Sequence, residues 1–86
     1  MPSIMTPDQV KWCQIETLRR NIDDCDERII ANLYERKRSS DIIQELKKQM
    51  GDPPQDPKRE ADIFRRVPHW ARPIFEAILL ASRGPT

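Results

Sequence analysis

The chain has 86 residues, of which 37% are hydrophobic and 34% are charged, and its formal net charge is +1. This length suits one domain with a small core, and the near-neutral charge argues against a nucleic acid or a membrane surface as partner. The longest apolar run is only a few residues, which excludes a membrane-spanning helix.

The chain offers few ligands for a metal ion or a disulfide. Its single histidine is His69, and its two cysteines, Cys13 and Cys25, lie on one predicted helix. Their spacing separates the thiols by about 18 Å, too far for a bond within the chain. Neither zinc-ligand spacing nor a secretory signal is visible. We therefore expect no metal, no cofactor and a reducing, cytoplasmic compartment.

A very long helix is predicted over residues 7–50. After Pro7 this segment contains no glycine or proline. Thr6 can cap its start in a capping box with Gln9, and Gly51 is placed to end it. Such a helix would be roughly 65 Å long, whereas a domain of this size has a radius of gyration of about 12 Å. Because one short chain cannot cover this helix, the length predicts an obligate homodimer with a two-fold interface.

One face of this helix changes from apolar to cationic along its length. At gaps of three, four and seven residues it contains Ile15, Leu18, Ile22, Cys25, Ile29, Arg36, Ser40, Ile43, Lys47 and Met50. Arg36 and Lys47 are three turns apart and therefore project from nearly the same side. A buried positive charge is costly unless a negative group meets it. Arg36 and Lys47 together therefore predict a site for an anion inside a helical core.

Two shorter helices are predicted at about residues 57–66 and 73–83. Asp56 can cap the first of them, with Pro57 at its first position. No alternation typical of strands and no internal repeat is present. The sequence therefore predicts an all-α fold in which residues 1–86 form a single domain of three helices.

The candidate functional residues are charged, and none of them is a nucleophile. There is no glycine-rich phosphate loop and no catalytic serine–histidine arrangement. What remains is a set of cations with two nearby acids: Arg19, Arg36, Lys47 and Arg59, with Asp56 and Glu60. Arginine binds carboxylates bidentately, and lysine supplies a point charge. This set predicts a pocket for a small polyanion that also carries a hydroxyl or an amine.

Several short motifs occur at a specific spacing within residues 18–82. They are Leu18-Arg19, Ile22, Asp26, Glu35-Arg36, Lys47 and Asp56-Pro57-Lys58-Arg59-Glu60-Ala61. Together they resemble the all-helical AroQ-type chorismate mutases. The resemblance implies an intertwined homodimer of three-helix chains, with each active site lined by both subunits.

The resemblance also assigns roles to the cations by position. Arg19 would reach into the partner's site and Arg36 would act within its own chain, and the two would clamp the carboxylates of a small dianionic substrate. Lys47 would contact a carboxylate and the ether oxygen of the breaking bond.

The remaining site residues would surround the substrate's ring. Arg59 would line the pocket near the ring. Asp56, largely through its backbone, and Glu60 would hold the ring hydroxyl. Ser82 matches a position near a carboxylate, although it is equally well explained as a small residue that packs against another helix.

The activity implied is the Claisen rearrangement of chorismate to prephenate, without cofactor, covalent intermediate or acid–base step. Such a reaction requires a folded, chair-like substrate and stabilisation of the charge that develops on the ether oxygen. Charged anchors such as Arg36, Lys47 and Glu60 suit this chemistry.

The chain departs from the family at one position. The family usually places a glutamine or glutamate four residues after the serine, where it hydrogen-bonds the ether oxygen. Here Thr86 stands in that place, after Gly84-Pro85. Removing one such donor costs about 3–4 kcal/mol, about a hundred- to a thousandfold in rate. Either turnover is weak alone, or a partner enzyme completes the site, or the substrate is a relative of chorismate.

Several alternatives stay open. An amine in place of the hydroxyl would still suit Glu60, so a 4-amino-4-deoxychorismate mutase and an isochorismate pyruvate lyase are alternatives on the same scaffold. A rival of another class is a non-catalytic helical module that binds a partner enzyme. A DNA-binding protein is the least favoured, given the near-neutral charge.

Overall fold

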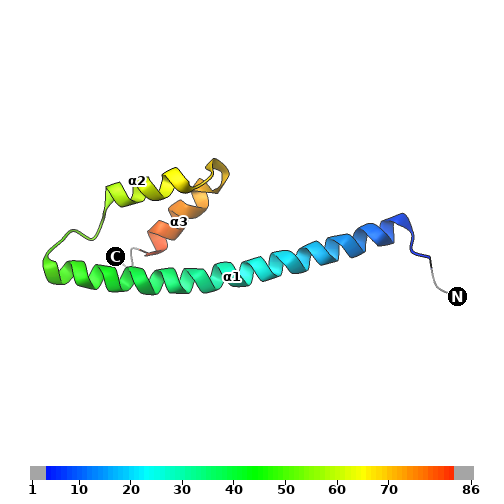
Figure 1. Ribbon diagram of the computed structural model, residues 1–86, viewed down its shortest axis with the longest axis horizontal. Coiled ribbons are helices and arrows are strands. Elements are labelled where there is room, and N and C mark those ends of the chain that lie inside the picture. The colour runs from blue at the N-terminus through cyan, green and yellow to red at the C-terminus, as the bar shows by residue number, and fades with distance from the viewer. Residues whose placement is uncertain (1–3, 83–86) are drawn as a thin grey trace. The chain divides into compact units, whose positions relative to one another are not determined.

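The computed structural model of the chain describes residues 4–82, and these residues form helices and no strands. In chain order the elements are α1 (Pro7–Met50), α2 (Pro57–Arg66), the short 3-10 helix η1 (His69–Ala71) and α3 (Arg72–Ser82) (Figure 1). The predicted all-α class is confirmed. The third helix begins one residue earlier than expected, and its expected last residue, Arg83, lies outside the described residues.

The start of α1 is fixed by a reciprocal pair of side-chain bonds. The Thr6 backbone N–H donates to Gln9 Oε1 at 2.8 Å, and the Gln9 backbone N–H donates to Thr6 Oγ1 at 3.2 Å. This arrangement is a capping box, which satisfies two backbone donors that have no partner within the helix. The local sequence therefore determines where α1 begins.

The end of α1 is equally well defined. Gly51 has a φ of 75°, and its N–H donates to the Lys48 carbonyl at 3.2 Å. The Asp52 N–H donates to the Lys47 carbonyl at 2.9 Å. These two bonds form a Schellman motif, which needs a residue in the left-handed region, where glycine has no steric penalty. The chain then turns toward α2.

Gly51→Ala is expected to destabilise the fold by about 1 kcal/mol, because alanine is strained at this φ. A Cβ added at Gly51 would meet no atom within 4 Å, so the cost would come from the backbone alone. Gly51→Asn is the matched control, since asparagine tolerates this conformation better. Urea unfolding of the three proteins measures the effect, and equal stability of the alanine variant would contradict it.

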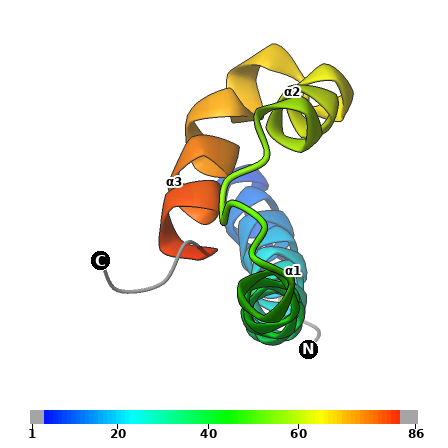
Figure 2. The ribbon, with the colours of Figure 1, turned by 90° about the vertical axis from the view of Figure 1, so that its left-hand side faces the viewer.

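The chain divides into two compact units, and the boundary between them in the sequence falls between Asn32 and Leu33, within α1. In the C-terminal unit, Figures 1 and 2 show that the chain turns back after α1. There α2 runs in the opposite direction along the C-terminal part of α1, and α3 returns from the end of α2 to α1. That residues 1–86 form a single domain stays a prediction.

A small core holds the C-terminal unit together. Its buried apolar residues are Ile63 of α2, Ala71 of η1 and Leu79 of α3. The Arg72 guanidinium lies 4.9 Å from the centre of the Phe64 ring, which adds a cation–π contact between α3 and α2. These contacts set the position of α2 and α3 in the unit that contains the candidate site.

The apolar face of α1 is not covered within the chain. No residue of α1 is buried, and Leu18, Ile22 and Ile29 are 60%, 58% and 54% exposed. Cys25, which lies on the same face, is exposed as well in the single chain. The physical reason is that the described part of the N-terminal unit contains no second helix to cover this face.

Candidate active site

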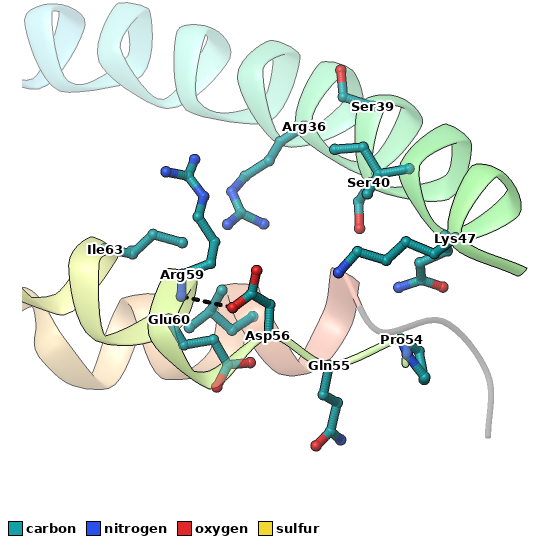
Figure 3. A pocket seen from close by; sticks show the side chains of 13 residues that line it. Arg36, Ser39, Ser40, Lys47, Pro54, Gln55, Asp56, Arg59, Glu60 and Ile63 are labelled. Atoms are coloured by element: carbon teal, nitrogen blue, oxygen red, sulfur yellow. Dashed lines mark hydrogen bonds between the residues drawn. The ribbon is translucent and has the colours of Figure 1, made fainter. Parts of the chain in front are cut away.

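A pocket of about 260 Å³ lies within the C-terminal unit and is lined by residues of α1, of the loop that follows it, of α2 and of α3 (Figure 3). This volume is close to the lower end of the range of about 300–1,000 Å³ typical of small-molecule sites. Its lining consists of Arg36, Ser39, Ser40, Ile43, Gln44, Lys47, Pro54, Gln55, Asp56, Arg59, Glu60, Ile63 and Leu79.

Three cationic side chains enter this pocket from two helices. Arg36 and Lys47 extend from α1, and Arg59 extends from α2, toward the same space (Figure 3). None of the ion pairs found within residues 4–82 involves any of the three. Arg36 and Lys47 are half-buried, which reduces the screening of their charges by solvent. Three positive charges on its lining are the kind of groups that bind carboxylates or other small anions.

Two acidic residues at the start of α2, Asp56 and Glu60, also line the pocket. Asp56 is the N-cap, and its Oδ1 accepts from the Arg59 backbone N–H at 3.0 Å. Glu60 follows in the first turn and is half-buried. Carboxylates are favoured at this end of a helix because unpaired backbone N–H groups gather there. The pocket thus combines anion-binding groups with acceptors for a hydroxyl or an amine.

Ser82 is buried at the end of α3 and is held by side chains of α1. Its hydroxyl donates to the Ile78 carbonyl at 2.7 Å and accepts from Arg36 Nη1 at 2.7 Å. Ser40 Oγ and Gln44 Nε2 donate to its carbonyl at 3.1 and 3.2 Å. Ser82 therefore adjoins the pocket through Arg36.

The structure brings most of the predicted site residues to this one pocket, namely Arg36, Lys47, Asp56, Arg59 and Glu60. Ser82 is in contact with Arg36 but does not line the pocket. Arg19 lies in the N-terminal unit, where its exposed side chain pairs with Glu16 at 3.1 Å. Thr86 lies outside the described residues.

Sequence reasoning missed part of the lining. Gln44 follows Ser40 by four residues and precedes Lys47 by three, so helical spacing could have placed it on the same face. Pro54 and Gln55 come from the loop between α1 and α2. No periodicity in the sequence predicts the path of such a loop.

Two further properties concern the described part of the chain. Residues 4–82 contain no group of three or more side chains that could hold a metal ion. None of the helices in this range is both long enough and apolar enough to cross a membrane.

Comparison with known proteins decides the family. The model of the family described as chorismate mutase type II matches residues 18–83, most of the chain. The chain belongs to the chorismate mutase type II family. The resemblance noted in the sequence is thereby confirmed, and the matched range includes every residue assigned a role in the site.

A relative in the family supports the same assignment. A chorismate mutase from Methanocaldococcus jannaschii is 33% identical over 54 residues, which make up 63% of this chain and 54% of that protein. The chain thus aligns with about half the length of this relative. No solved structure matches the chain significantly.

Proposed function

We propose that the chain is a chorismate mutase, which converts chorismate to prephenate by a Claisen rearrangement. The observation that carries the proposal is the pocket in which Arg36, Lys47 and Arg59 meet without an ion-pair partner among residues 4–82. The substrate is a dianion, so binding supplies the negative charge that the pocket needs. Among small dianions, chorismate is the substrate that membership of the chorismate mutase type II family supports.

The cations on α1 are assigned to the chemical step. Arg36 binds one carboxylate through its planar guanidinium, which presents several N–H donors in a fixed geometry. Lys47, half-buried on the same face, donates to a carboxylate and to the ether oxygen, where negative charge develops as the C–O bond breaks. Holding the substrate in its chair-like conformer supplies the rest of the acceleration. No nucleophile and no proton transfer is required.

The groups at the start of α2 are assigned to the ring of the substrate. Arg59 borders the ring, and Asp56 and Glu60 accept a hydrogen bond from its hydroxyl. A carboxylate accepts from an amine equally well. The 4-amino analogue of chorismate is therefore the alternative substrate, and an assay with both compounds distinguishes the two.

The dimer is part of the proposal. The uncovered apolar side chains of α1 include Leu18, Ile22 and Ile29, and large exposed apolar patches are typical of interaction surfaces. A second copy of the chain would bury this face and would bring its own Arg19 to the open side of the pocket. The two free thiols fit a reducing compartment, which we propose to be the cytoplasm.

The proposal is tested by incubating the purified chain separately with chorismate, its 4-amino analogue and isochorismate, and by identifying the products by NMR. Formation of prephenate from chorismate is the expected result. Conversion of another compound in place of chorismate would reassign the substrate on the same scaffold. If none of the three compounds is converted, even with candidate partner enzymes added, the proposal is wrong and the chain is a non-catalytic helical module that binds a partner enzyme.

A further inference from the structure

Three polar side chains of α1 reach one residue at the end of α3. Arg36, Ser40 and Gln44 follow each other at intervals of four residues, so they lie on one face of the helix. Each makes a hydrogen bond with Ser82, which is only 9% exposed. A buried polar residue requires such partners. All three α1 side chains also line the pocket.

Two of these bonds hold the backbone of Ser82. The last carbonyls of a helix have no partner within the helix, and a carbonyl oxygen can accept two hydrogen bonds. Ser40 Oγ at 3.1 Å and Gln44 Nε2 at 3.2 Å supply both of them. The end of α3 is thus attached to α1 by two donors that do not involve Arg36.

The third bond connects this attachment to the pocket. The only proton of the Ser82 hydroxyl is donated to the Ile78 carbonyl, so the oxygen can only accept from the Arg36 guanidinium. One of the five N–H groups of Arg36 is used in this bond, and the others stay available to a ligand. The direction of the guanidinium therefore depends on where Ser82 is held.

We propose that Ser40 and Gln44 are positioning residues, which hold Ser82 so that its hydroxyl orients Arg36 before an anion binds. The inference rests on the proposed function for the role of Arg36 toward substrate. Ordering a long side chain in advance reduces the conformational entropy lost on binding. Neither Ser40 nor Gln44 needs to contact the substrate for this effect.

The test compares Gln44→Met, which keeps the side-chain length but removes the donor, with Ser40→Ala and the hydroxyl-retaining Ser40→Thr. The first readout is ¹⁵N relaxation of the Arg36 Nε–H group in the ligand-free protein. We expect Arg36 to become more mobile in Gln44→Met and Ser40→Ala, to recover in Ser40→Thr, and Arg59 to stay unchanged. Gln49→Met, an exposed position whose amide bonds Glu45, is the matched control.

The second readout is catalytic. In the Gln44→Met, Ser40→Ala double variant, kcat/KM is expected to fall by about ten- to a hundredfold, largely through KM. An Arg36 mobility that does not change, or that rises equally at Arg59, would overturn the inference. If the wild-type chain converts none of the chorismate-type substrates, the mobility of Arg36 still decides this inference, so the two proposals fail separately.

Discussion

Replacing Lys47 by alanine is expected to lower kcat/KM for chorismate by about a hundred- to a thousandfold, and Arg36→Ala by a similar factor. The Lys47 ammonium is half-buried and has no ion-pair partner among residues 4–82, so its charge is available to the substrate. Alanine is the most favourable residue in a helix, so the helicity of the variants should not change. The mass of the dimer is expected to stay the same as well. The loss of chorismate absorbance with time measures the effect.

Lys37→Ala is the matched control for this loss of charge. Lys37 lies on the same helix but pairs with Asp41 at 2.6 Å and does not line the pocket. Pairs of this kind contribute only a few tenths of a kcal/mol, so nearly full activity is expected. Full activity of either the Arg36 or the Lys47 variant would mean that the catalytic site lies elsewhere.

Mixing Arg19→Ala chains with Lys47→Ala chains is expected to restore activity that each variant lacks alone. In a dimer whose sites combine Lys47 of one subunit with Arg19 of its partner, each heterodimer contains one intact site. Random exchange of subunits would therefore recover about a quarter of the wild-type activity. Native mass spectrometry measures the fraction of heterodimer, and the chorismate assay measures the recovery.

A mixture of Arg36→Ala and Lys47→Ala chains is the control for this experiment. Because Arg36 and Lys47 line the same pocket of one chain, every site of the heterodimer would lack one of them, and no activity should return. Recovery in this control, or its absence in the Arg19 mixture despite confirmed heterodimers, would contradict a site shared in the proposed way.

The features that the sequence predicted well are those determined by neighbouring residues. The ends of α1 follow from the capping box of Thr6 and Gln9 and from the positive φ of Gly51. Arg36 and Lys47 meet in one pocket because eleven residues of helix place them on one side. Both depend on residues close together in the sequence.

Features that depend on packing between distant segments could not be predicted in the same way. The bond between Gln44 and Ser82 joins residues 38 positions apart, and it exists because α3 ends against α1. Cys25 lies on the apolar face of α1 and is exposed in the single chain, because a sequence pattern identifies such a face but not the segment that covers it. The role proposed for Arg19 likewise depends on a contact with a distant segment, here one of a second chain.

The most direct test of the central claim is to follow the arginine Nε–H signals in ¹⁵N NMR spectra while prephenate is added to the purified chain. The proposed pocket predicts saturable shifts at Arg36 and Arg59, which line it. Arg65 and Arg72, which pair with Asp62 and Glu76 outside this lining, are expected to stay unchanged. Saturable shifts at Arg65 and Arg72 with none at Arg36 and Arg59 would contradict the account.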